Sequence, residues 1–380
     1  MNDNKISKNS IVAKFAVPIS FLILFFLAAN FTDCDLVTFW KRRNHLTDLV
    51  VDMIPPDFSY IQKILLPLFY TIQMSVTGTV LGTFFALVLS PFGAANLGFP
   101  AVIRRILRIV IQILRSFPAL ILALTATFLF GLGTFAGTFA ITLYTFAIMT
   151  KLTYEDASAA DVKAYQALRA MGVSKYVAYI HGILPEIIPG FLTNALYLLE
   201  TNVRHSSILG YVGAGGIGLL LNEKISWLEY DKVGTILLML FLTVCVIEYF
   251  SRYLAALIRK ERTIKKEQAR LLLLFLAALF LICTFTLSLP DFSRTSPQTL
   301  RNMFAGFLQP DWSFFFSAEK DGLGYLLLET VCIAFIGTVI GAIVSAPLAF
   351  LNTKRFVPAP VSFLFNLVIM VIRSVPFLVY

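Results

Sequence analysis

The residues of this sequence that could do chemistry fall into two groups: a cluster of glycines, and a few arginines inside apolar runs. Gly213, Gly215 and Gly218 have the spacing G-x-G-x-x-G, which cradles the phosphates of a dinucleotide when it joins a strand to a helix. Here the motif lies between two long apolar runs, which disfavours a dinucleotide site. Five glycines between 210 and 218 favour an irregular backbone at a helix break instead.

The arginines could bind an anion. Arg115 and Arg373 occupy the similar segments LRSFP and IRSVP, and a guanidinium donates paired hydrogen bonds to the oxygens of an anion. We expect both to be candidates for contact with an anionic substrate, with pairing of Arg115 to Glu200 or Glu248 as the alternative. The three histidines and four cysteines show no spacing typical of a site, so we predict no catalytic residue, metal site or disulfide.

The composition indicates the class of protein that must position these residues. Of 380 residues, 58% are hydrophobic and 14% are charged, and the mean hydropathy is +0.80. A soluble protein needs polar side chains over its surface, and roughly 25% charged residues is usual. The apolar runs are long and continuous, which excludes soluble and disordered proteins and predicts an all-α polytopic membrane protein.

The apolar runs also predict the topology, because about 20 apolar residues cross a bilayer as a helix. Basic residues precede the first run and recur in every second loop, so the positive-inside rule places the N-terminus in the cytoplasm. The segment 153–185 then lies inside, and the mixed-charge loops 31–63 and 290–322 lie outside. This bias explains the net charge of +9 without nucleic-acid binding. The predicted spans are 11–30, 64–91, 103–130, 134–151, 186–204, 232–256, 271–289, 323–350 and 359–380.

The glycine cluster falls at the outer side in this topology. Irregular backbone in a membrane is tolerated only beside protein or a water-filled path. We therefore expect residues 204–218 to line or gate the external end of a pathway, with a surface turn that caps the bundle as the alternative. The candidate residues are Arg204, Gly213, Gly215, Gly216 and Gly218.

The sequence contains a repeat in parallel orientation. Residues 71–82 read TIQMSVTGTVLG and residues 330–341 read TVCIAFIGTVIG, an offset of 259 (330 − 71), and both contain a GxxxG pair suited to close helix packing. Nothing in the second unit matches 119–258, so we expect either an early end of the reading frame at Tyr380 or a remnant unit. The predicted domains are a first unit of about six spans (1–258), a basic cytoplasmic linker (259–270) and a partial second unit of about three spans (271–380).

Residues 153–185 form a polar segment between two apolar runs. Two [ST]-x-x-[DE] patterns, at Thr153 and Ser158, predict helix starts, and Gly172 predicts a break before a second short helix. Small residues recur at steps of three and four, which lets another protein approach closely. We interpret the segment as a coupling helix presented to a partner; the alternative is an amphipathic helix packed on its own bundle or on lipid headgroups.

Part of this segment resembles a known loop. QALRAMG, followed by ILP, is similar to the EAA loop of permease subunits of ABC importers, and residues 200–218 and 231–260 resemble phosphonate importer permeases in particular. The sequence departs from the family at Gln166, where Glu is usual, at Gly182, where a branched apolar residue is usual, and in having no second EAA loop. The coupling residues implied by the resemblance are Gln166, Ala167, Leu168, Gly172, Ile183, Leu184 and Pro185.

The resemblance implies a MetI-like type I importer fold with a truncated second repeat, in the inner membrane of a bacterium. The chain would be a non-enzymatic permease subunit of an ATP-driven importer for phosphonates or related phosphorus oxyanions. ATP and Mg would bind a separate ATPase subunit, an extracytoplasmic binding protein would deliver the substrate, and a second permease half or copy would complete the pathway. An ion-driven secondary transporter of a small anion is the alternative, which would dispense with the 153–185 segment and carry membrane-embedded acids.

Overall fold

The structure is a computed structural model that describes residues 19–33, 51–261, 265–288, 311–317, 322–353 and 355–374, with a few single residues in the gaps between these ranges. For Arg373 and Ser374 it describes the backbone only. Every regular element in the described ranges is a helix. The lysines before residue 19, on which the predicted N-terminal orientation depends, and Tyr380 lie outside the described residues.

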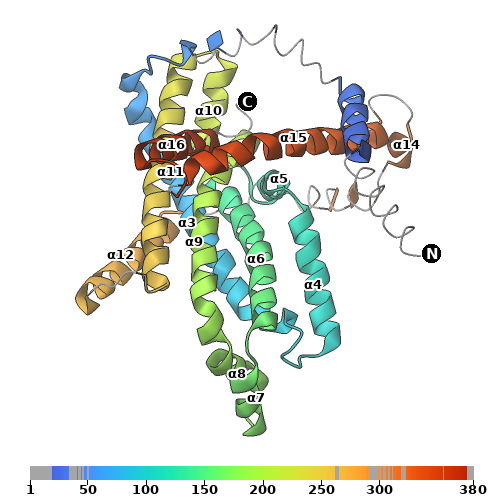
Figure 1. Ribbon diagram of the computed structural model, residues 1–380, viewed down its shortest axis with the longest axis vertical. Coiled ribbons are helices and arrows are strands. Elements are labelled where there is room, and N and C mark those ends of the chain that lie inside the picture. Colours follow the sequence, from blue (N-terminus) through green and yellow to red (C-terminus); the bar gives the residue numbers. More distant parts are fainter. Residues whose placement is uncertain are drawn as a thin grey trace, which may run out of the picture. The chain divides into compact units, whose positions relative to one another are not determined.

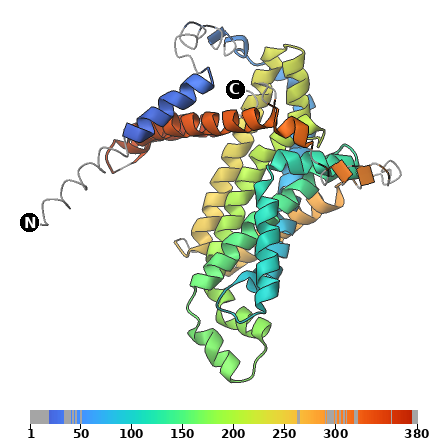
Figure 2. The ribbon, with the colours of Figure 1, turned by 90° about the vertical axis from the view of Figure 1, so that its right-hand side faces the viewer.

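The larger of two compact units comprises Asp52–Asn302 with Met370–Tyr380. Its long helices α3, α6, α9 and α11 lie side by side, and the short helices α7 and α8 project at one end (Figures 1 and 2). The elements are η1 (Phe58–Tyr60), α3 (Ile61–Gly93), α4 (Ala101–Ser116), α5 (Ala119–Phe130), α6 (Thr134–Ala159), α7 (Lys163–Ala170), α8 (Lys175–Gly182), α9 (Leu184–Leu209), η2 (Gly210–Val212), α10 (Ile217–Ser226), α11 (Tyr230–Ile258) and α12 (Lys266–Phe285).

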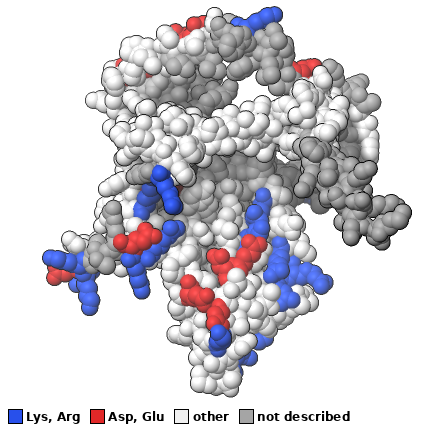
Figure 3. Space-filling model, in the orientation of Figure 1, with Lys and Arg blue, Asp and Glu red and all other residues white. Residues whose placement is uncertain are grey.

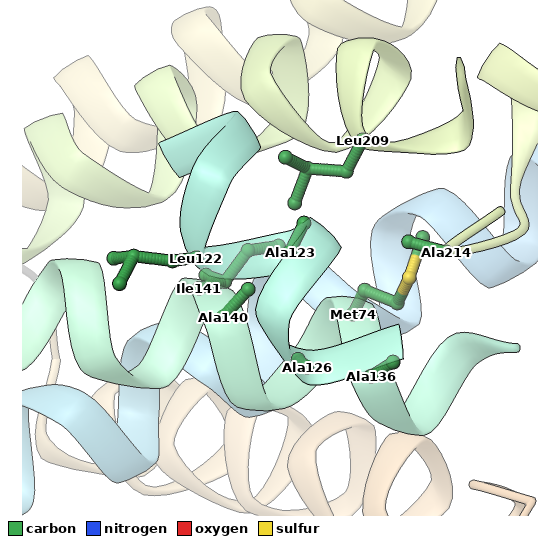
Figure 4. Packing of buried hydrophobic residues seen from close by; sticks show 9 residues of the cluster. All are labelled: Met74, Leu122, Ala123, Ala126, Ala136, Ala140, Ile141, Leu209 and Ala214. Atoms are coloured by element: carbon green, nitrogen blue, oxygen red, sulfur yellow. The ribbon is translucent and has the colours of Figure 1, made fainter. Parts of the chain in front are cut away.

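Small residues let these helices approach one another closely. A Cβ at Gly78 would lie 2.7 Å from Ile141, and one at Gly82 would lie 2.7 Å from the backbone oxygen of Thr142, so α3 and α6 touch almost backbone to backbone. The neighbouring core is mostly alanine, with Met74 filling the remaining space (Figure 4). Its members come from α3, α5, α6, α9 and the loop after η2: Met74, Leu122, Ala123, Ala126, Ala136, Ala140, Ile141, Leu209 and Ala214.

One predicted span is broken. The prediction of a continuous helix over 103–130 is wrong, because α4 ends at Ser116 and α5 starts at Ala119 with a bend of 95° between them. Pro118 has no N–H to donate and disfavours helical backbone at the residue before it, and Phe117 is accordingly extended, with φ −84° and ψ 126°. Helices α8 and α9 meet at a second bend of 70°.

Five helices of the described residues are long and apolar enough to cross a membrane, or up to seven if each bent pair counts as one span. They are η1 with α3, α6, α11, α12 and α15 (Leu323–Asn352), with the bent pairs α4–α5 and α8–α9. The first and last predicted spans correspond to shorter apolar helices over Ile19–Phe31 and Ala359–Ile372. Each of the nine predicted apolar segments therefore contains helix, while residues 11–18 and 375–380 lie outside the described part.

The smaller unit comprises Met1–Val51 with Met303–Ile369. In it the helix Ile19–Phe31 packs along α15, with ring contacts of Phe21 to Phe335 and Phe31 to Tyr325, each at 5.0 Å between centroids. An apolar cavity of about 470 Å³ lies between these two helices. The unit also contains α14 (Trp312–Phe315) and the start of α16 (Ala359–Ser374).

Candidate functional site

The polar segment 153–185 folds as a helical hairpin, α7 and α8, after the end of α6. The two predicted helix starts are wrong, because α6 continues to Ala159 and the hydroxyls of Thr153 and Ser158 donate back to Met149 and Tyr154, each at 2.6 Å. Asp161 orders the start of α7 instead, since its Oδ1 accepts the backbone N–H of Lys163 at 2.9 Å. This hydrogen bond lowers the pKa of Asp161 below its usual value.

Gly172 ends α7 as the sequence predicts. Its φ is +84°, a left-handed conformation that glycine adopts without a steric penalty. The N–H of Val173 reaches back to the carbonyl of Leu168 at 3.2 Å, which satisfies an open carbonyl at the helix end and reverses the chain. The side chain of Arg169 also donates to the carbonyl of Val173. A backbone hydrogen bond and the side chain of Arg169 therefore both stabilise the turn of the hairpin.

Close contact between the two helices explains the unusual glycine at 182. A Cβ at Gly182 would lie 2.8 Å from the backbone nitrogen of Tyr165, so a branched residue at this position would force α7 and α8 apart. The Tyr165 hydroxyl donates to the carbonyl of Leu97 at 2.6 Å, and burial raises the pKa of Tyr165, which keeps this donor protonated. The hairpin is thus attached firmly to the loop between α3 and α4.

The predicted coupling residues divide into an outer and an inner set. Gln166, Ala167, Gly172 and Pro185 are exposed, and Met171, beside them at the tip, is 70% exposed. Leu168, Leu184 and Ile183 face inward, where Leu168 and Leu184 pack against a buried cluster that includes Ile183. The hairpin therefore presents a mostly small and apolar outer surface on a fixed base.

The glycine cluster is a tightly packed break between α9 and α10. Gly213, Gly215 and Gly216 have φ values of +82°, +78° and +74°, so the backbone turns through left-handed conformations. A Cβ at Gly218 would lie 1.7 Å from the carbonyl oxygen of Ser207, which excludes any side chain there. Gly216 and Gly218 are buried, whereas Gly213 and Gly215 are partly exposed.

Long-range hydrogen bonds hold this break against the bundle. The N–H of Ile217, the first residue of α10, donates to the hydroxyl of Thr71 on α3 at 2.8 Å. The N–H of Gly133, just before α6, donates to the carbonyl of Gly213 at 3.0 Å. Ala214 is fully buried between them in the alanine-rich core (Figure 4). The break is thus a part of the interior of the unit.

The two acids considered as partners of Arg115 each pair with an arginine of their own helix. Glu200 accepts a hydrogen bond from Arg204, and Glu248 accepts one from Arg252. Arg115 is exposed in the last turn of α4, directly before the bend, rather than in the middle of a continuous span. The side chain of Arg373 lies outside the described residues, so its predicted contact with an anion stays a prediction.

Comparison with known proteins places this geometry in a family. Residues 78–264, which contain the hairpin and the glycine break, match the binding-protein-dependent transport system inner membrane component family. The chain is 31% identical over 217 residues to the phosphite transport system permease protein PtxC of Stutzerimonas stutzeri, covering 57% of this chain and 79% of that protein. The chain belongs to this permease family. The prediction of a transmembrane permease subunit of an ABC importer, itself not an enzyme, is confirmed.

Two further comparisons concern a second relative and a solved structure. It is 31% identical over 203 residues to the phosphate-import permease protein PhnE of Mycolicibacterium smegmatis, covering 53% of this chain and 38% of that protein. A solved structure of the MetNI methionine ABC transporter in an inward-facing conformation aligns with a TM-score of 0.48 and 21% identity, over 53% of this chain and 99% of the solved one.

Charged groups of the permease differ between the two ends of its larger unit. Lys and Arg atoms gather over α4 and near α7 and α8, with acidic atoms between them (Figure 3). The opposite end carries a compact mixed group around Lys224, whose Nζ lies 2.9 Å from Glu229, 3.0 Å from Glu223 and 4.1 Å from the ring centre of Trp227. Burial lowers the pKa of Lys224, but hydrogen bonds to Glu229 and Glu223 outweigh it and leave the pKa above its usual value.

Sequence reasoning missed the residues that anchor the hairpin of the permease. Asn96 donates to the carbonyls of Ala157 and Ser158 at 2.9 and 3.3 Å, and Lys175 donates to the carbonyl of Gly98. Together with Tyr165 they join the α3–α4 loop to the end of α6 and to α8. Tyr165 is one of four tyrosines in 153–185, so the sequence did not single it out as an anchor.

Proposed function

We propose that this permease carries phosphorus oxyanions of the phosphite and phosphonate class into the cell. The observation that carries the proposal is the similarity to PtxC, a phosphite transport permease, over 79% of that protein's length. Phosphite, phosphonate and phosphate share a tetrahedral centre with charged oxygens, so one pathway with guanidinium groups suits all three. Arg115, Arg204 and Arg373 are the proposed contacts.

The α7–α8 hairpin is the proposed coupling element. Its exposed residues Gln166, Ala167, Gly172 and Pro185, with Met171 at the tip, would dock in a groove of the partner ATPase, which binds the ATP and Mg²⁺. Packing in the buried cluster by Leu168, Ile183 and Leu184 would fix the position of these exposed residues. Because Tyr165 and Lys175 join the hairpin to the α3–α4 loop, closure of two ATPase subunits would turn the bundle as a rigid body and switch access from one side to the other.

The orientation we propose places this hairpin and the N-terminus in the cytoplasm. Arg104, Arg105 and Arg108 start α4 beside the hairpin, and α11 ends at the same end of the unit with Arg259 and Lys260. The opposite end mixes lysines with Asp57, Glu223, Glu229 and Asp231, as expected of an external face. An extracytoplasmic binding protein would deliver the substrate there, and residues 204–218 would gate the pathway beneath it.

We further propose that residues 271–380, which include most of α12 together with α14, α15 and α16, form a partial second permease unit parallel to the first. Asp57 and Asp311 support this, since each accepts the N–H of a serine two residues later, at 2.9 and 3.0 Å, and starts a short helix before a long one. A complete pathway in this arrangement needs a second permease half or a second copy of the chain.

The test is uptake by the assembled transporter in proteoliposomes, with the ATPase and binding protein added and ³³P-labelled phosphite or phosphate as the probe. ATP-dependent uptake supports the proposal; uptake driven by an ion gradient without the ATPase would support the secondary transporter instead. In the variant Ala167→Trp, the bulky side chain should block docking and abolish both uptake and ATPase stimulation. Ala101→Trp, exposed at the same end on α4, is the matched control and should retain both.

A further inference from the structure

Two apolar helices carry a Glu–Arg pair four residues apart, and the two arginines differ in burial although both glutamates are buried. Glu200 and Arg204 pair on α9, and Glu248 and Arg252 pair on α11. The side chain of Arg204 is 15% exposed, whereas that of Arg252 is 61% exposed. A guanidinium held inside a span is costly, which points to a function for Arg204 that Arg252 does not share.

The hydrogen bonds of Arg204 are incomplete. Among the described residues, its Nε is a buried donor with no acceptor, and the Nδ1 of the adjacent His205 is likewise buried without a partner. A buried polar atom without a hydrogen-bond partner costs free energy. A polar ligand that hydrogen-bonds to the Nε of Arg204 and the Nδ1 of His205 would remove that cost. The Nε and a neighbouring Nη form one edge of the guanidinium, and that edge fits two oxygens of a tetrahedral anion.

Other elements bring suitable groups to the same place. The ring of His205 lies edge-on to the ring of Tyr144 on α6, with 5.2 Å between the centroids. The ring of Tyr144 on α6 thus lies next to that of His205, the residue that follows Arg204 on α9.

We infer that Glu200 is a built-in counterion at an oxyanion-binding step: it neutralises Arg204 while the pathway is empty and is displaced from the guanidinium by the passing anion. The inference rests on the proposed function and adds to it. The pair is neutral as a whole, which lowers the cost of keeping Arg204 in the membrane. A carboxylate tethered one helical turn away competes at a high effective concentration, so the anion binds weakly and leaves readily, as transport requires.

The experiment measures binding of ³³P-phosphite to the assembled transporter in nanodiscs without the binding protein. Glu200→Gln removes the competing charge and should tighten binding at least about tenfold, the effect of gaining one charge-assisted hydrogen bond. Glu248→Gln is the matched control, because it removes the same buried carboxylate from the pair whose arginine is exposed, and it should leave binding unchanged. Equal affinities of the wild type and Glu200→Gln, or equal shifts in both variants, would overturn the inference.

A second variant guards against loss of folding, since Glu200→Gln leaves a buried cation unpaired. The double variant Glu200→Gln with Arg204→Gln is neutral and should fold, yet bind phosphite more weakly than the wild type. Binding unchanged from the wild type would show that the pair serves structure alone. If the wild-type transporter takes up neither phosphite, phosphate nor methylphosphonate, the proposed function fails; if it takes them up and the variants behave as the control does, the counterion inference alone fails.

Discussion

Helices α3 and α15 have related sequences and different surroundings. Both contain the GTVxG segment, at 78–82 and 337–341. In α3 the two glycines contact α6, and 50% of the apolar stretch is buried, whereas in α15 a Cβ at Gly337 or Gly341 would meet nothing within 4 Å, and 6% of the stretch is buried. A glycine pair therefore permits close packing but does not by itself create it, because the partner helix must be supplied.

The residues between the shared positions explain which helix finds partners inside its unit. Gln73 of α3 donates hydrogen bonds to α12, and the hydroxyl of Ser75 lies within hydrogen-bond distance of Ser206 on α9. Their counterparts in α15 are Cys332 and Ala334. Cys332 lines the apolar cavity beside the helix Ile19–Phe31. The polar side chains of α3 thus select its neighbours, and α15 has lost them while it keeps the small residues.

The largest difference between the two helices should come from filling the glycine face. Gly82→Leu places a side chain 2.7 Å or less from the backbone of α6, and should destabilise the larger unit by at least about 3 kcal/mol. Gly341→Leu, its counterpart in α15, should change stability by less than about 0.5 kcal/mol. Thermal unfolding in detergent, followed by size-exclusion chromatography, measures both. Equal losses would mean that α15 packs as tightly as α3.

Converting Gln73 to its α15 counterpart should have the next largest effect. Gln73 Nε2 donates to the carbonyl of Cys283 at 3.0 Å and to the hydroxyl of Thr286 at 2.8 Å, at the end of α12. Gln73→Cys should destabilise this contact by about 2 kcal/mol, since both hydrogen bonds are lost. Hydrogen exchange should speed up in α12 and stay unchanged in α6. Unaltered exchange in α12 would show that apolar contacts alone hold it.

Thr71 and Thr330 occupy the same position of the repeat and should respond differently to valine. The hydroxyl of Thr71 accepts the buried N–H of Ile217, whereas that of Thr330 donates only within its own helix, to Leu326. Thr71→Val should cost about 1.5 kcal/mol, because it leaves a buried N–H without an acceptor, and Thr330→Val should be nearly neutral. The measurement is the midpoint of thermal unfolding, and a matching shift in the two variants would contradict the comparison.

Ser75→Ala, which copies Ala334 of α15, should have the smallest effect. The Ser75 hydroxyl donates to the carbonyl of Thr71 at 2.7 Å and lies 3.1 Å from the hydroxyl of Ser206 on α9. Its loss removes one contact between helices and should cost about 0.5 kcal/mol, the typical strength of such bonds in membranes. Ser345→Ala on the exposed side of α15 is the control. A loss above that of Thr71→Val would reverse the order proposed here.

The sequence by itself determined the features whose causes are local. Long apolar runs predicted the helical membrane class, Gly172 predicted the reversal between α7 and α8, and the glycines after 210 predicted a break. Hydrophobicity, and the backbone freedom of glycine, act within a few residues, so they can be recognised along the chain. Pro118 marks a position at which a helix is weakened, but the predicted span over 103–130 did not include the 95° bend between α4 and α5, both of which contact α6.

Only the tertiary structure decided which distant residues meet. Gln73 reaches a carbonyl 210 positions away, and Tyr165 reaches one 68 positions away; no spacing in the sequence indicates either. Arg204 and Arg252 each have a glutamate one turn earlier on the same helix. The two arginines differ only in how far their side chains are buried, which the sequence does not indicate. The cost of a charge or an open hydrogen bond depends on its surroundings, and those surroundings form only when the helices pack.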